Sequence, residues 1–271
     1  MPELPEVETT RRGIAPALIG RRVTHVVVRD RRLRWPIDGH FEAAITHQIV
    51  RRIERRAKYI LIAFDQGTLI LHLGMSGSLR VLGADVPPTA HDHWDIQVDS
   101  GAVLRFHDPR RFGSALWTES DPLEHKLLAK LAPEPLSDSF DAAYLYRATR
   151  RRAVAIKQFI MNSQAVVGVG NIYASEALFR ARIAPRRAAR RITRAQAAAL
   201  SQAIKDVLSE AIEIGGTTLR DYVNADGIPG YFRQKLFVYE RDGQPCRVCK
   251  KPVKQFVQGQ RSTYWCAVCQ R

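Results

Sequence analysis

Four cysteines near the end of the chain constrain its folding more than any other feature. They form two C-x-x-C pairs with residues 250–265 between them: Cys246, Cys249, Cys266 and Cys269. Each pair presents two thiolates from one tight turn, and two such turns complete a tetrahedral structural zinc site. Residues 236–271 are too few to bury a core, so one Zn²⁺ must supply much of their folding free energy, about 10 kcal/mol. The alternatives are an iron–sulfur cluster or a redox-active pair.

A β-hairpin is predicted between the two cysteine pairs. Residues 253–257 and 261–265 alternate in polarity around Gln258-Gly259-Gln260, which places Arg261 beside the turn. A basic hairpin held by zinc is suited to contact a phosphate backbone. The alternative is a purely structural clip.

The first half of the chain is dominated by short segments rich in β-branched and aromatic residues. Asp65-Gln66-Gly67 and Asp99-Ser100-Gly101 are typical hairpin turns between such segments. Eight short strands with turns between them indicate a sandwich or a barrel, preceded by a helix over 1–14. The predicted strands are 23–29, 49–53, 59–64, 68–73, 79–82, 94–98, 103–107 and 114–117.

The pattern changes at Ala132-Pro133-Glu134-Pro135, where two prolines predict a linker. Apolar residues then recur at helical spacing over 140–151, 154–162, 172–182 and 194–214, with Thr193 as an N-cap. Residues 215–235 are Gly-rich and long enough for a functional loop. We therefore expect an α+β multidomain chain with domains at 1–132, 136–235 and 236–271.

The charge of the chain indicates a polyanionic partner. Lys and Arg number 42 against 27 Asp and Glu, which gives +15 and a pI of about 10.1. Nucleic acid is the first candidate and an anionic membrane the second, while a solvated basic surface is the alternative. The longest apolar run, Tyr59–Phe64, is far below the roughly 18–20 residues of a membrane span. The acidic start lacks the apolar core of a signal peptide, so we expect an intracellular protein.

The chain begins Met1-Pro2-Glu3-Leu4-Pro5-Glu6. Removal of Met1 would leave Pro2 as a secondary α-amine with a reference pKa of about 8. A usable fraction of this amine is therefore neutral and nucleophilic at cellular pH. Attack by such an amine on a sugar carbon gives an iminium intermediate, and Glu3 and Glu6 are near enough in sequence to move protons. The alternative is a stable, solvent-exposed start.

Two further motifs carry weaker signals. Val166–Tyr173 contains Gly168 and Gly170 and leads into a predicted helix with Asn171 at its N-cap, which suits a phosphate. A capped helix start without a ligand has the same appearance. His91-Asp92-His93 has the residue types of a metal site, although without a third ligand nearby polar packing is the better interpretation.

Six motifs in order give the chain its resemblance to a known family. They are the start Pro2–Glu6, then Arg55–Tyr59, His72–Gly77, His107–Gly113, Val167–Tyr173 and the closing cysteine hairpin. Together they cover nearly the whole chain and resemble formamidopyrimidine-DNA glycosylase, the bacterial base-excision repair enzyme for oxidised purines. The resemblance implies a two-layered N-terminal β-sandwich, a helix–two-turns–helix domain and a zinc hairpin.

The resemblance also implies residue roles. Pro2 would be the nucleophile, Glu3 the proton carrier and Lys58 a catalytic residue at a phosphate, with Glu6 as a second acid. The implied DNA contacts are His91, Arg110, Lys157, Asn171 and Arg261. Met75, Arg110 and Phe112 would fill the space left by the extruded base, although Met75 alone would pass for a core residue. The loop 217–231 would cap the lesion.

The implied reaction is excision of 8-oxoguanine or a formamidopyrimidine from double-stranded DNA, followed by β,δ-elimination through a Schiff base on Pro2. Arg261 would donate the proton of the δ step, and the only cofactor would be one structural Zn²⁺. We expect a monomer in the bacterial cytoplasm, associated with the nucleoid when on DNA. Two alternatives remain: an endonuclease VIII-like glycosylase for oxidised pyrimidines, and a non-enzymatic zinc protein that binds nucleic acid. Leu4 and the set Met75, Arg110 and Phe112 favour the purine enzyme.

Overall fold

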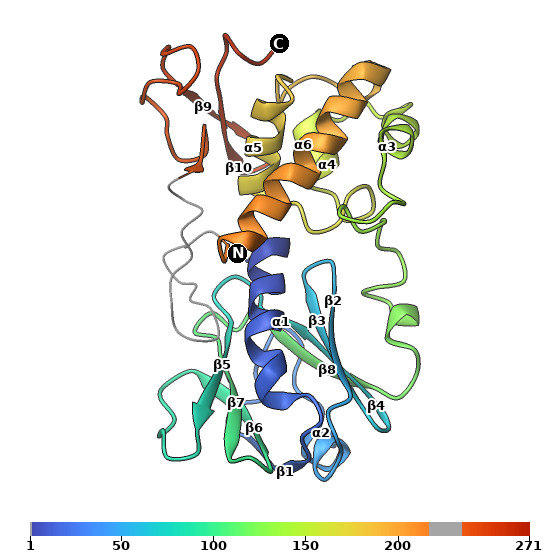
Figure 1. Ribbon diagram of the computed structural model, residues 1–271, viewed down its shortest axis with the longest axis vertical. Coiled ribbons are helices and arrows are strands. Elements are labelled where there is room, and N and C mark those ends of the chain that lie inside the picture. Colours follow the sequence, from blue (N-terminus) through green and yellow to red (C-terminus); the bar gives the residue numbers. More distant parts are fainter. Residues whose placement is uncertain (1, 217–234) are drawn as a thin grey trace. The chain divides into compact units, whose positions relative to one another are not determined.

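The computed structural model describes residues 2–216 and 235–271. Their contacts group the chain into two compact units (Figure 1). Unit 1 comprises Met1–Ala129 and Ile214–Tyr231, and unit 2 comprises Lys130–Glu213 and Phe232–Arg271. The chain therefore leaves unit 1 and returns to it before it completes unit 2. The division into three domains stays a prediction, and the predicted capping loop 217–231 lies outside the described residues.

Unit 1 is a two-layered antiparallel β-sandwich, which confirms the first of the two architectures expected from the strand pattern. One sheet has the strand order β1-β6-β7-β5 and the other β2-β3-β4-β8. The strands are β1 (Val23–Val28), β2 (Arg52–Arg56), β3 (Tyr59–Phe64), β4 (Gly67–His72), β5 (Ser78–Gly83), β6 (Asp92–Val98), β7 (Ala102–His107) and β8 (Ser114–Thr118).

Turn chemistry sets the register of these sheets. Phe64 pairs with Gly67, so Asp65-Gln66 is a two-residue turn between β3 and β4. The inner faces pack large side chains, among them Trp94 and Phe106, whose rings stack with centroids 5.4 Å apart. Such burial of apolar surface is the main stabilising contribution to the sandwich.

Two local predictions in unit 1 are wrong. Residues 49–53 do not form a strand: β2 begins at Arg52, because Ile49 forms an isolated bridge to Arg22 at the edge of the other sheet. The short helix α2 (Phe41–Ile45) has no counterpart among the predictions. It forms because its two buried ends, Phe41 and Ile45, cover one end of the core.

Helix α1 (Leu4–Leu18) contacts strands of both sheets of unit 1. Its buried residues Val7, Ile14 and Leu18 recur at helical spacing, which fixes the face that enters the core. The helix begins at Leu4 and ends four residues beyond the predicted end, and Pro16, which has no N–H, costs it one backbone hydrogen bond near the C-terminus. These contacts with both sheets hold the helix, and with it the start of the chain, against the sandwich.

Unit 2 is helical with a C-terminal hairpin. Helix α6 packs against α3 and α5, and Thr193 caps it as predicted, because Gln196 N donates to Thr193 Oγ1 (3.1 Å). The helices are α3 (Ala142–Thr149), α4 (Ile156–Ile160), α5 (Asn171–Arg180) and α6 (Arg194–Glu213), and the hairpin is β9 (Lys254–Gln258) and β10 (Arg261–Trp265). The described residues also include the 3₁₀ helices η1 (Pro122–Glu124) in unit 1 and η2 (Ala189–Arg191) in unit 2.

A buried carboxylate in α5 holds the segment that leads to the hairpin. Glu176 is 1% exposed and accepts the N–H groups of Phe237 (2.8 Å), Val238 (2.9 Å) and Tyr239 (2.9 Å). Burial raises the pKa of Glu176, and the three N–H donors oppose that rise. The carboxylate therefore fixes the chain where it enters the C-terminal part of unit 2.

No helix within residues 2–216 and 235–271 is long and apolar enough to cross a bilayer.

Candidate functional site

The first turn of α1 brings two carboxylates beside Pro2. Glu3 is the N-cap residue and forms a capping box with Glu6, in which Glu3 N donates to Glu6 Oε2 (2.8 Å). Pro2 is buried, and Glu3 and Glu6 are 3% and 0% exposed. Gly216, with φ +84°, approaches so closely that an added Cβ would lie 3.1 Å from Glu6 Oε1. Carboxylates enclosed in this way are suited to hold and return a proton.

Lys58 lies in the two-residue turn between β2 and β3, where Arg56 pairs with Tyr59. Ala57, the other turn residue, takes φ +55°, and Arg55 donates to its carbonyl oxygen (2.9 Å). The same Arg55 binds Glu8 of α1 (3.2 Å), so the turn is tied to the helix that carries Pro2. The turn and the chain start thus belong to one hydrogen-bonded arrangement.

His72, at the end of β4, is a neutral neighbour of Lys58. Burial, the positive charge of Lys58 and that of Arg34 lower the pKa of His72 to about 4. Its Nδ1 accepts the N–H of Gly74 (3.0 Å), and its ring lies 4.9 Å from that of Tyr59. His72 carries no charge at neutral pH, so the positive charge at this place comes from Lys58 and Arg34. Such a positive environment suits a phosphate. Nothing in the sequence pattern had singled out His72 for this role.

The residues predicted to fill the space of an extruded base lie on two loops of unit 1. Met75 lies on loop 73–77 between β4 and β5, and Arg110 and Phe112 lie on loop 108–113 between β7 and β8. Phe112 is 45% exposed, and the Arg110 guanidinium carbon lies 5.0 Å from the centre of its ring. Met75 is half-buried. An exposed aromatic ring beside an arginine is able to stack against bases.

The His91-Asp92-His93 triplet is polar packing rather than a metal site. Asp92 accepts from His107 Nδ1 (2.9 Å) and from Thr89, while His93 is 1% exposed against backbone carbonyls. His91 is exposed with φ +73°. Among the described residues, the only cluster with metal-binding potential is that of the cysteines.

The predicted phosphate-binding turn of unit 2 differs from the expectation in one respect. Gly170, not Asn171, is the N-cap of α5, and Asn171 is the first helical residue. Its side chain turns instead to the hairpin, where Nδ2 donates to the carbonyl oxygen of Ser262 (3.0 Å). The N-cap assignment is wrong because Gly170 already has the extended backbone of a cap, with φ −119°.

Lys157 is buried beneath this turn. It is 1% exposed, and its Nζ donates to Asn171 Oδ1 (2.6 Å), Thr263 Oγ1 (2.8 Å) and the carbonyl oxygen of Ser262 (3.1 Å). An ammonium has three protons, and these three acceptors match them. The structure thus joins Lys157 and Asn171, two residues predicted separately, to strand β10.

Arg261 lies at the exposed end of the hairpin, as predicted. Gln258 pairs with Arg261 across the two-residue turn Gly259-Gln260, whose φ values are +54° and +59°. Two left-handed residues are the mark of a type I′ turn, which matches the strand twist. Arg261 is exposed, and it follows directly after the turn.

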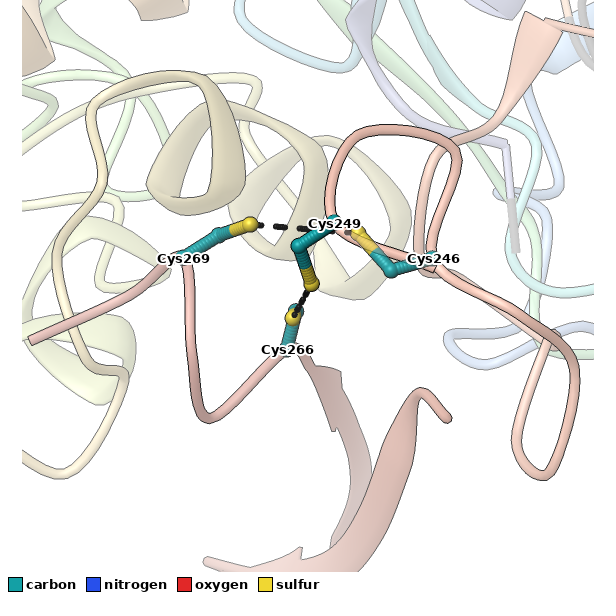
Figure 2. A group of neighbouring side chains, drawn as sticks. All are labelled: Cys246, Cys249, Cys266 and Cys269. Carbon is teal, nitrogen blue, oxygen red and sulfur yellow. Dashed lines mark hydrogen bonds between the residues drawn. The ribbon is translucent and has the colours of Figure 1, made fainter. Parts of the chain in front are cut away.

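The four cysteines meet at the base of the hairpin (Figure 2). All four sulfur atoms lie within 4.8 Å of one another, with Sγ–Sγ distances of 3.9 Å between Cys246 and Cys269 and 3.4 Å between Cys249 and Cys266. Sulfur atoms around a tetrahedral Zn²⁺ at 2.3 Å are about 3.8 Å apart, so the cluster fits the metal. These separations exclude disulfides.

The titration of the cluster shows why it needs a cation. Burial acts to raise the pKa of Cys246, but hydrogen bonds from the backbone N–H groups of Cys249 and Val248 and from the Cys266 and Cys249 side chains together outweigh it and lower that pKa to about 7. Burial and the three neighbouring sulfur atoms raise the pKa of Cys269 to about 12. Four adjacent thiolates are therefore unstable alone, and a bound Zn²⁺ would compensate their charge.

Family comparisons cover most of the chain. Residues 1–115 match the formamidopyrimidine-DNA glycosylase N-terminal domain, residues 131–223 match the formamidopyrimidine-DNA glycosylase H2TH domain, and residues 243–271 match a zinc finger found in FPG and IleRS. Proteins named formamidopyrimidine-DNA glycosylase from Thioalkalivibrio sulfidiphilus and Pseudomonas entomophila are 62% and 57% identical, with 100% of each chain covered.

Solved structures give the same result. The crystal structure of the MutM (FPG) protein from Thermus thermophilus aligns with a TM-score of 0.89 at 39% identity, over 99% of this chain and 98% of that one. A Lactococcus lactis FPG variant in complex with DNA containing Fapy-dG aligns with a TM-score of 0.93 at 29% identity, with 100% of both chains covered. A MutM complex with DNA containing carbocyclic 8-oxo-G aligns with a TM-score of 0.91 at 30% identity, again over 100% of both chains.

Proposed function

The chain belongs to the formamidopyrimidine-DNA glycosylase family, and from that premise we propose how its own residues carry out the reaction. It is a bifunctional DNA glycosylase and abasic-site lyase that removes oxidised purines, and its partner is double-stranded DNA that contains such lesions. One structural zinc belongs to the hairpin. The observation that supports the residue assignment best is the pair of buried carboxylates, Glu3 and Glu6, next to Pro2.

Pro2 is the nucleophile once Met1 has been removed. Its amine forms a bond to C1′ of the extruded nucleotide while the bond from C1′ to the base breaks, and the proton that the amine releases goes to the departing base. Glu3 then gives a proton to the ring oxygen of the sugar, which opens the ring and leaves an iminium ion. The Glu3 carboxylate takes a proton from C2′ as the 3′ phosphate leaves, and in the δ step loss of a second proton, from C4′, expels the 5′ phosphate. Glu6 keeps Glu3 in place through the capping box.

Lys58 acts at a phosphate near the reacting sugar. Lys58 lies in the β2–β3 turn, and the neutral ring of His72 adds no charge beside it. A fixed cation at this point stabilises the charge that develops on a departing phosphate.

Unit 2 supplies further DNA contacts. Arg261 is exposed beside a rigid turn, where it is able to grip a phosphate and donate the proton of the δ step. Asn171 is the second phosphate contact. Lys157 is buried behind both, so we propose that it positions Asn171 and β10, in place of the direct contact that the family resemblance implies.

Unit 1 contacts DNA through His91 and the two loops. His91 is exposed for a backbone contact. Arg110 and Phe112 are exposed and enter the duplex with Met75 when the damaged base leaves. A base inside the stack is out of reach of the Pro2 amine, so extrusion precedes the chemistry. The curated relatives are bacterial, and we propose that the chain acts in the bacterial cytoplasm on nucleoid DNA.

Borohydride trapping tests the nucleophile. Wild-type protein incubated with abasic-site DNA and borohydride should yield a covalent adduct, and peptide mapping should place it on Pro2. Pro2→Gly should lose most strand cleavage, whereas the same change in the linker, Pro133→Gly, should not. Full cleavage by Pro2→Gly, or an adduct on a lysine, would contradict the assignment. Mass spectrometry of the active protein must also show that Met1 is absent.

The choice of substrate distinguishes the purine-specific enzyme from the endonuclease VIII-like alternative. The purine enzyme should excise 8-oxoguanine in preference to thymine glycol, and the reverse preference would indicate the endonuclease VIII-like activity. A protein that only binds nucleic acid would give neither excision nor an adduct.

A further inference from the structure

We propose that Asp108 and Ser76 lock loops 73–77 and 108–113 together and so position Met75, Arg110 and Phe112 for insertion into DNA. The inference rests on the proposed role of those three residues. We call the two segments the wedge loops. Asp108 and Ser76 are positioning residues here, because neither reaches the reacting atoms.

The Asp108 carboxylate bridges the two wedge loops. It is 0% exposed; Oδ1 accepts from Ser76 Oγ (2.7 Å), and Oδ2 accepts from Gly113 N (2.7 Å). Ser76 is 7% exposed, and its Oγ in turn accepts the N–H of Arg110 (3.3 Å). One carboxylate thus holds loop 73–77 through Ser76 and the far end of its own loop through Gly113.

The backbones of the wedge loops touch directly. A Cβ added at Gly74, where φ is +67°, would lie 2.4 Å from Gly113 N and 2.4 Å from the carbonyl carbon of Phe112. A Cβ at Gly113 would lie 2.6 Å from the Phe106 ring. Only glycine fits at Gly74 and at Gly113, so no side chain separates the two backbones there. With the backbones in direct contact, the hydrogen bonds of Asp108 and Ser76 set the position of one loop relative to the other.

The buried imidazole of His93 contacts the backbone of the same aspartate. His93 is 1% exposed, and its Nε2 lies 2.9 Å from the carbonyl oxygen of Asp108, while Nδ1 lies 3.0 Å from that of Asp30. The backbone N of Asp108 donates to the carbonyl oxygen of His91 (3.0 Å). The base of the wedge is therefore fixed at side chain and backbone, whereas Phe112 at its tip is 45% exposed.

Rigidity at this base has a function in extrusion. Unstacking and unpairing a base costs about a few kcal/mol, which the contacts of the inserted side chains must offset. Loops that are already ordered lose less conformational entropy on insertion, so more of the contact free energy remains for this purpose. A preformed abasic site has no base to extrude, so its cleavage needs the lock much less. The lock should thus affect excision more than elimination.

The experiment measures the two steps under single-turnover conditions in two duplexes of the same sequence, one with the damaged base and one with a preformed abasic site. Ser76→Ala removes the donor to Oδ1, and Asp108→Asn places an amide N–H₂ against a donor. Each variant should slow excision of 8-oxoguanine opposite cytosine by on the order of tenfold to a hundredfold, as for displaced positioning groups. Cleavage of a preformed abasic site should stay within about threefold, and the enzyme concentration that gives half the maximal rate should change less than the maximal rate constant itself. A 2-aminopurine next to the lesion should report slower unstacking.

Asp95→Asn is the matched control for lost stability. Asp95 is a buried aspartate of the same sandwich that binds Arg105 (2.8 Å) and Arg29 (2.6 Å) and no wedge-loop residue. At equal loss of melting temperature it should keep the ratio of excision to elimination. Parallel loss of both steps in the Asp108 and Ser76 variants, or an equal ratio change in Asp95→Asn, would overturn the lock. Failure of the proposed function would show differently, as absence of any trapped adduct in the wild type.

Discussion

Replacement of Lys157 by methionine separates a residue that positions the DNA-binding surface from one that touches DNA. The side chain keeps its length and loses its charge. The described contacts place the ammonium on Asn171, Ser262 and Thr263, and 1% of the residue is exposed. A direct phosphate contact would require the ammonium to abandon these acceptors.

The expected loss of stability in Lys157→Met follows from the three hydrogen bonds of the ammonium. Each bond from a charged donor contributes about 1.5–3 kcal/mol net, but the variant also avoids the desolvation of a buried ammonium. We expect a loss of about 2–4 kcal/mol in the free energy of unfolding of unit 2. At about 2–4 °C per kcal/mol, the melting temperature should fall by roughly 5–15 °C.

Salt dependence of DNA affinity gives the decisive measurement. Arg261→Met should reduce the slope of log affinity against log salt by about 0.9, because one phosphate contact is lost. Lys157→Met is then added to that background, so that any indirect effect through Arg261 is already absent. If Lys157 only positions its neighbours, affinity falls and the slope does not change further. A second reduction of about 0.9 would refute the positioning role and restore the direct phosphate contact.

Three further predictions concern buried groups. Glu176→Gln leaves at least one backbone N–H, that of Phe237 in the better amide orientation, facing an amide N–H₂, so urea unfolding should show a loss of about 1–3 kcal/mol; an unchanged midpoint would contradict the anchor. Cys266→Ser removes one thiolate, so metal analysis should find much less than one zinc per chain, and full occupancy would exclude the four-sulfur site. His72 has a pKa of about 4 in the folded chain, below its ordinary value. The unfolded chain therefore binds the proton first, and stability should fall by about 1 kcal/mol per pH unit between about pH 6.5 and 4. His72→Asn should flatten that decline, and an identical pH profile would argue against the buried neutral ring.

The sequence predicted most of the secondary structure because local patterns determine it directly. Strands Tyr59–Phe64 and Arg261–Trp265 were bounded by turn residues with one favoured geometry, and their bounds are confirmed. Helix α2 (Phe41–Ile45) escaped because five residues carry too little periodicity to distinguish a helix from a loop. Its formation depends on a core that only the folded sandwich provides.

The candidate site was predicted in its residue types but not in its connections. The zinc cluster followed from spacing alone, since two C-x-x-C turns carry their own geometry. The links from Lys157 to Asn171, and from Ser76 to Asp108, join segments 14 and 32 residues apart, and no local pattern encodes such pairs. The two glycines near Ser76, Gly74 and Gly77, were the one available hint that two backbones approach there.

The order of the two units along the chain bears on how the protein is made. Unit 1 consists of Met1–Ala129 together with a stretch that starts at Ile214, and the intervening residues belong to unit 2. The amine that we propose as the nucleophile thus leaves the ribosome first, whereas the fold that frames it is completed only after Gly216 has reached Glu6. The nascent chain should therefore carry its reactive end for most of its synthesis without the surroundings that make it an enzyme. Truncation before residue 214 should leave both units incomplete.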